Sequence, residues 1–89
     1  MNELSEELSK YLISQSAKIL KCDESDINWE DDLDENGFES MQVNQLCVEI
    51  NNSFSVGINP ALFLEVTSLS NLSQYLQSNY YSQLETNLL

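Results

Sequence analysis

Two long stretches of the chain repeat apolar residues at helical spacing. In residues 3–21 the apolar positions are mostly three or four residues apart, and they are Leu4, Leu8, Tyr11, Leu12 and Ile19. In residues 40–54 they are Val43, Leu46, Cys47, Ile50 and Phe54. Because an α-helix brings positions three and four residues apart to one face, each stretch predicts an amphipathic helix.

Further helices are predicted in the last third of the chain. Pro60 suits the first turn of a helix, so residues 60–66 predict one or two turns of short helix. Ser68 is the expected N-cap of a longer helix, whose apolar positions are Leu69, Leu72, Tyr75, Leu76 and Tyr80. Residues 79–89 are expected to fray. No stretch alternates apolar and polar residues with period two, so no sheet is expected.

Residues 22–39 lack a helical stripe and are strongly acidic. They hold nine of the fifteen acidic residues, with isolated large apolar side chains at Ile27, Trp29, Leu33 and Phe38. This pattern predicts a long ordered loop that is pinned to the core at several points. The expected fold is an all-α four-helix bundle with three longer helices, a short third helix and a long first loop. We expect a single domain over residues 1–89, with its core in residues 3–78.

The balance of charge narrows the classes of partner. The chain has fifteen acidic and three basic residues, a net charge of −12. It therefore offers little to neutralise phosphates, so neither nucleic acid nor an anionic membrane is an expected partner. No segment has the apolar length of a membrane span, and the N-terminus lacks the pattern of a signal peptide. With only Cys22 and Cys47, we expect reduced thiols in a cytoplasmic protein.

The residue types present allow two kinds of site to be assessed, histidine-dependent catalytic or zinc sites and an EF-hand calcium loop. The chain has no histidine, which excludes Ser-His-Asp and Cys-His catalysis and most zinc sites, so no enzyme activity is expected. Asp32, Asp34, Asn36 and Gly37 match the first half of an EF-hand calcium loop. The twelfth position of that loop would be Val43, which has no oxygen ligand, so no metal site is expected.

Ser40 stands at the predicted start of the second helix and allows two interpretations. The first is an N-cap, although Val43 three residues later cannot complete a capping box. The second is an acceptor for a phosphodiester, which would face the free N–H groups of the helix. Gly37 would allow a sharp turn, Phe38 would anchor it, and Glu39 would lie beside the hydroxyl.

Residues 37–41, "GFESM", resemble the motif G-x-D-S-[LI] of acyl carrier proteins. Residues 60–76, "PALFLEVTSLSNLSQYL", are similar to the short third helix of that family and the x-P-T-L-x-x-L pattern after it. The resemblance covers roughly residues 4–77. It implies that Ser40 carries a 4′-phosphopantetheine arm, which a phosphopantetheinyl transferase attaches from coenzyme A. The chain departs from the family pattern at three positions. Glu39 replaces the usual Asp, Met41 replaces Leu or Ile, and Thr67 stands where Pro is common.

Among carriers, the chain looks most like those of bacterial polyketide synthases. Its second helix has one acid, Glu49, whereas carriers of fatty acid synthesis have a strongly acidic second helix. Fatty acid and peptidyl carriers are the second and third interpretations. The resemblance implies a non-catalytic monomer that holds acyl or polyketide intermediates as thioesters and delivers them to ketosynthase, acyltransferase and other synthase enzymes. The expected docking residues are Met41, Gln42, Gln45 and Glu49. An acidic helical adaptor that is never modified remains open.

Overall fold

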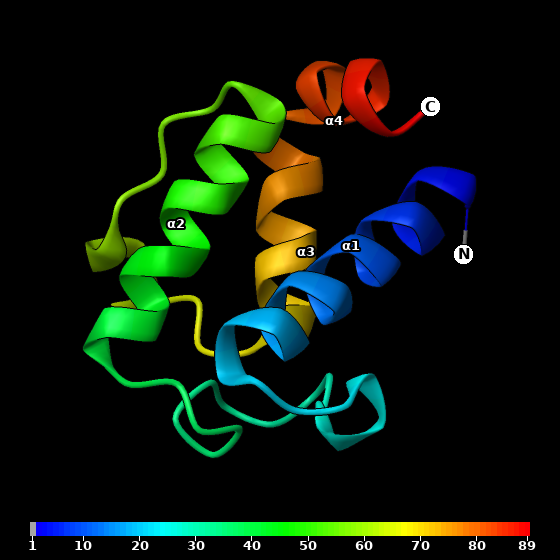
Figure 1. Cartoon of the computed structure of the whole chain (residues 1–89). Helices are drawn as coiled ribbons and strands as arrows, with labels where there is room; N and C mark the ends of the chain where they lie inside the picture. Colours follow the sequence, from blue (N-terminus) through cyan, green and yellow to red (C-terminus); the bar gives the residue numbers. More distant parts are fainter. Residues whose placement is uncertain (1) are drawn as a thin grey trace.

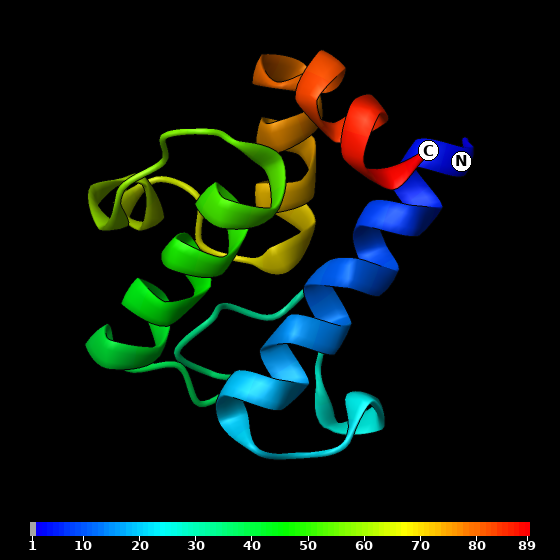
Figure 2. The same cartoon turned by 45° about the horizontal axis from the view of Figure 1, so that its top comes forward.

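The computed structural model describes residues 2–89. Four α-helices and two 3-10 helices follow one another along the chain (Figures 1 and 2), as α1 (Glu3–Leu20), η1 (Glu24–Asp26), α2 (Ser40–Phe54), η2 (Pro60–Leu64), α3 (Leu69–Asn79) and α4 (Tyr81–Leu88). Within the described residues no strand forms, and Asp32 and Ser68 make only an isolated antiparallel bridge. The predicted all-α four-helix bundle with a long first loop is confirmed.

Helix α1 has the boundaries that its sequence indicates. Asn2 is its N-cap, and the Asn2 side chain accepts a hydrogen bond from the backbone N–H of Ser5 at 2.8 Å. Glu3 and Glu6 lie in the first turn, where negative charge complements the helix dipole. The helix ends at Lys21, which adopts the left-handed conformation with φ of 59°. α1 therefore begins and ends close to the predicted limits.

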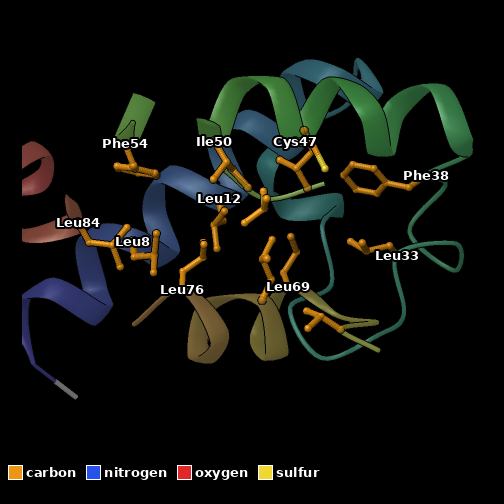
Figure 3. Packing of buried hydrophobic residues seen from close by; sticks show 14 of the residues in the cluster. Leu8, Leu12, Leu33, Phe38, Cys47, Ile50, Phe54, Leu69, Leu76 and Leu84 are labelled. Carbon is orange, nitrogen blue, oxygen red and sulfur yellow. The ribbon is translucent and has the colours of Figure 1, made fainter. Parts of the chain in front are cut away.

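The core is formed by one apolar face from each helix. Figure 3 shows Leu8 and Leu12 of α1 pointing toward Ile50 and Phe54 of α2, with side chains of α3 completing the cluster. The leucines and isoleucine of this group are fully buried. Each such side chain contributes roughly 1.5–3 kcal/mol through its burial. The apolar stripes predicted for residues 3–21, 40–54 and 68–80 are thus the faces that meet.

The first loop is ordered by hydrogen bonds to the start of α3. The backbone N–H of Leu33 donates to the carbonyl oxygen of Thr67 at 2.8 Å, and that of Ser70 donates to the carbonyl oxygen of Trp29 at 3.1 Å. Leu33 and Phe38 are buried and point into the core from the loop (Figure 3). The expectation of a long loop pinned at several points is confirmed, and the loop holds residues 37–39 in place before α2.

The predicted short third helix is present as a 3-10 helix. Residues Pro60–Leu64 form η2, two residues shorter than the predicted segment 60–66. Asn59 caps it, since its side-chain oxygen accepts a hydrogen bond from the N–H of Ala61 at 2.9 Å. η2 packs against α2. It therefore brings a further apolar segment beside that helix.

The expectation that residues 79–89 fray is wrong. Tyr81–Leu88 form α4, which contacts α1, α2 and α3 at the end of the bundle opposite the first loop (Figures 1 and 2). Leu84 is 0% exposed, so the core extends beyond the predicted limit at residue 78. A helix of eight residues is marginal in isolation, and burial against three other helices stabilises it.

Candidate functional site

Ser40 is the first residue of α2, and its N-cap is Glu39. Glu39 has an extended backbone, and its N–H donates to the Gln42 side-chain oxygen at 3.1 Å. This contact is one half of a capping box, one residue earlier than the position considered in the sequence. The N-cap interpretation of Ser40 is therefore wrong. Ser40 is exposed, and within residues 2–89 its hydroxyl makes no hydrogen bond.

The turn before Ser40 depends on two neighbouring residues. Gly37 has φ of 106°, which side-chain-bearing residues rarely adopt. Phe38 is only 4% exposed, and its N–H donates to the carbonyl oxygen of Leu33 at 3.0 Å. The expected functions of Gly37 as the turning residue and Phe38 as the anchor agree with this geometry. The chain is thereby held so that the next two residues start α2 at the surface.

An open hollow of about 530 Å³ lies beside the hydroxyl. Its apolar lining comes from the loop, from α2 and from η2, and consists of Leu33, Phe38, Val43, Pro60, Phe63 and Leu64. Polar lining residues include Asp32, Asp34, Glu39 and Asn44. The first turn of α2 adds backbone N–H groups and the positive end of the helix dipole. The site can therefore accommodate a flexible chain joined to Ser40, with an anionic group at the helix start.

The four expected docking residues divide into two groups. Met41 is 68% exposed, and it lines a groove between α1 and α2 together with Gln45 and Glu49. Gln42 is half-buried, and its side chain is engaged by the N–H of Glu39, so it lies outside this groove. The structure thus brings three of the four residues together.

Two exposed apolar residues near the site were missed from the sequence. Val48 is 54% exposed and lines the same groove as Met41. It lies seven residues after Met41 and outside the core stripe, so helical spacing could have identified it. Leu64 in η2 is 85% exposed and borders the hollow beside Ser40. The sequence offered no signal for Leu64, because its exposure depends on how η2 packs.

Other chemically reactive groups lie away from Ser40. Within residues 2–89, no group of three or more His, Cys, Asp or Glu side chains is placed to hold a metal ion. Cys47 is buried on α2, and its desolvation raises the pKa of the thiol, whereas Cys22 is exposed. Across the described chain, no helix combines the length and apolarity needed to cross a membrane.

Comparison with known proteins yields one family. The model of a protein family described as "Phosphopantetheine attachment site" matches residues 10–76, more than half of the chain. The matched range runs from α1 to α3 and includes Ser40 and the hollow beside it, and it ends before α4. No solved structure was found to match the chain.

Proposed function

Because the chain belongs to the phosphopantetheine-attachment family, whose members bind 4′-phosphopantetheine covalently, we propose that Ser40 Oγ is the attachment point in this carrier protein. The observation that carries the proposal is the free, exposed hydroxyl at the start of α2. Glu39 is the cap of the helix, so modification of Ser40 removes no capping interaction.

The residues around Ser40 suit such a group. The backbone N–H groups of the first turn of α2 favour a phosphate at this position. Val43, Phe63 and Leu64, which belong to the apolar lining of the hollow, can contact the carbon chain that follows. When attached, the group supplies a thiol that holds an acyl chain as a thioester. The protein residues contribute attachment and orientation.

We propose that the cargo belongs to polyketide synthesis. Support comes from the "GFES" motif and from α2, on which Glu49 is the single acidic residue. Ketosynthase and acyltransferase enzymes would then receive the arm, and Met41, Gln42, Gln45 and Glu49 are proposed to contact them. Fatty acid and peptidyl synthesis are the alternatives. Loading by the enzymes of the three classes distinguishes them: acyltransferases of polyketide and fatty acid synthesis, and an adenylating enzyme for the peptidyl class. The correct class is expected to acylate the modified protein fastest.

The proposed location and the proposed lack of catalytic activity rest on the cysteine and histidine content of the chain. We propose a cytoplasmic monomer of one domain that has no catalytic activity of its own. Both cysteines are free, as expected for a reducing compartment. The absence of histidine in the chain removes the usual base for a serine or cysteine nucleophile.

The attachment site is tested by intact-mass measurement. Unmodified protein is incubated with coenzyme A and a broad-specificity phosphopantetheinyl transferase. Wild type is expected to gain one phosphopantetheine group, and Ser40→Ala is expected to gain none. Ser82→Ala is the matched control, because Ser82 is also exposed near the start of a helix. This control should gain one group, like wild type.

Two outcomes would contradict the proposal. A mass gain in Ser40→Ala would move the attachment to another residue. No gain in folded wild type that starts unmodified would favour the alternative of an acidic helical adaptor. Circular dichroism of each variant verifies that the helices are retained.

A further inference from the structure

The groove between α1 and α2 differs from the hollow at Ser40 in both place and chemistry. It has a volume of about 720 Å³, and its walls are the last turns of α1 and the first turns of α2. Met41 and Val48 provide exposed apolar surface on the α2 side, and Ile19 provides a half-buried apolar side chain on the α1 side. Solvent-facing apolar side chains gathered in one groove are typical of a binding surface.

The charge of this groove is opposite to that of the molecule. Lys18 and Lys21 are exposed on its α1 wall, and they are two of the three basic residues in a chain with net charge −12. Within residues 2–89, neither lysine makes a salt bridge, whereas the third, Lys10, pairs with Glu7 at 3.5 Å. Both lysines stand at the C-terminal end of α1, where they complement the helix dipole and keep their ammonium groups free.

The lysines lie at the end of the groove nearer to Ser40. The hydroxyl of Tyr11 hydrogen-bonds the carbonyl oxygen of Glu49 at 3.2 Å and the Ser53 hydroxyl at 2.7 Å, which aligns the middle of α1 with the end of α2. Lys18 is two helical turns further along α1, about 10 Å along the helix axis, and α1 ends at the end of the bundle where α2 begins (Figures 1 and 2). Glu49 therefore lies at the level of the middle of α1, whereas the lysines lie at its end.

We propose that this groove is a docking site for a helix of a partner protein, with apolar side chains that contact Met41 and Val48 and carboxylates that pair with Lys18 and Lys21. Charge complementarity carries this choice, because two unpaired ammonium groups flank exposed apolar surface. A helix seated there would contact Met41, the residue that follows Ser40. The inference rests on the proposed function only in assigning the partner to the enzymes that act on an arm at Ser40.

The test uses synthetic helical peptides and unmodified wild-type protein, so that it does not depend on attachment at Ser40. One peptide carries leucines at spacings of three and four residues flanked by glutamates, and the other has lysines in place of the glutamates. Each is titrated into ¹⁵N-labelled protein at about 0.15 M salt, where charges more than about 8 Å apart are largely screened. The glutamate peptide is expected to shift the amide signals of Lys18, Ile19, Gln45 and Val48.

Variants separate the charge contribution from the apolar contribution. Lys18→Glu/Lys21→Glu should weaken binding of the glutamate peptide about tenfold, and Lys10→Glu, outside the groove, should leave it unchanged. Val48→Asp should also weaken binding, and Leu64→Asp, at a more exposed apolar position outside the groove, should not. All of these positions are at the surface, so the fold is expected to be retained.

The proposal is overturned by any of three results. These are the absence of groove signals in the titration, equal binding of the lysine peptide in the groove, and unchanged affinity in the Lys18→Glu/Lys21→Glu variant. Since the intact-mass experiment is independent of these titrations, failure of docking and failure of attachment at Ser40 can be told apart.

Discussion

Ser40 and Ser68 both stand at the start of a helix, yet their hydroxyl groups differ in what they bind. Ser68 is buried and is the N-cap of α3, where its Oγ accepts a hydrogen bond from the N–H of Asn71 at 3.1 Å. Ser40 is one position inside α2, because Glu39 is the cap. A difference of one residue in capping register thus leaves one hydroxyl engaged in the fold and the other available for chemistry.

Gly37 permits the turn that precedes Ser40. Two factors could require a glycine there, the space around a Cβ and the backbone angle φ, and the structure separates them. A Cβ at Gly37 would come no closer than 3.9 Å to Leu20 Cδ2, so space is adequate and the φ of 106° is the obstacle. Gly37→Ala is therefore expected to destabilise the fold by about 1–3 kcal/mol. Urea unfolding measures the change.

Gly57→Ala is the matched control for that variant. Gly57 lacks a positive φ, and a Cβ there would meet nothing within 4 Å. Removing a glycine at such a position reduces the entropy of the unfolded chain, and the expected effect is a gain of about 0.4–1 kcal/mol. Equal losses in the two variants would refute the conformational argument for Gly37.

At the scale of elements, α4 closes the bundle at the end opposite Ser40. It lies outside the family match over residues 10–76, yet it contacts all three other α-helices. Its buried residue is Leu84, and half-buried Tyr80 and Leu88 pack against the same core. These three are four residues apart, so a single face of a two-turn helix covers the end of the core.

Leu84→Ala tests whether α4 is part of the cooperative fold. Removing this fully buried side chain leaves a cavity, and the expected loss is about 2–5 kcal/mol in the free energy of unfolding. Chemical denaturation followed by circular dichroism measures it. Leu89→Ala at the exposed end of the chain should change stability by less than about 0.5 kcal/mol. A negligible effect of Leu84→Ala would mean that α4 is separable from the core.

For the whole molecule, the distribution of charge is uneven. The first loop concentrates carboxylates, and the described residues contain one salt bridge, between Lys10 and Glu7. With a net charge of −12, the compact state brings like charges together, and this repulsion opposes folding. The negative charge of the first loop attracts basic partners over a long range. The α1–α2 groove differs, because its two free lysines favour an acidic partner.

Salt should therefore stabilise the protein. Raising NaCl from about 0.01 M to about 0.15 M shortens the screening length from roughly 30 Å to roughly 8 Å. Relief of about 1 kcal/mol of repulsion corresponds to a rise in Tm of roughly 4–8 °C for a domain of this size. Thermal unfolding at each salt concentration measures it.

A variant with fewer loop charges provides the comparison for the salt experiment. Asp23→Asn, Glu24→Gln and Asp31→Asn together remove three exposed negative charges from the loop. The variant should show a shallower rise of Tm with salt than wild type does. A Tm that stays constant or falls with salt in wild type would contradict the importance of self-repulsion.

Sequence reasoning predicted α1, α2, α3 and the long loop, and it identified Ser40 as the candidate for attachment that we propose above. The helices could be predicted because their apolar positions repeat with the helical period over three or more turns, a local property of the chain. Leu33 and Phe38 could be predicted as anchors because large apolar residues in a charged segment have few other places to lie. These features depend on residue type and spacing, which are fully written in the sequence.

Tertiary structure decided the features that depend on contacts between distant segments. α4 has only one buried leucine and two turns, so its stability comes from packing against the other helices. α2 begins at Ser40, as predicted, but its N-cap is Glu39 and not Ser40, because the loop holds Glu39 where it can cap the helix. The exposure of Leu64 follows from how η2 packs against α2. The packing of α1 against α2 places Lys18 and Lys21 across a groove from Met41 and Val48. Helical spacing could not predict either feature, because it orients side chains only within one element.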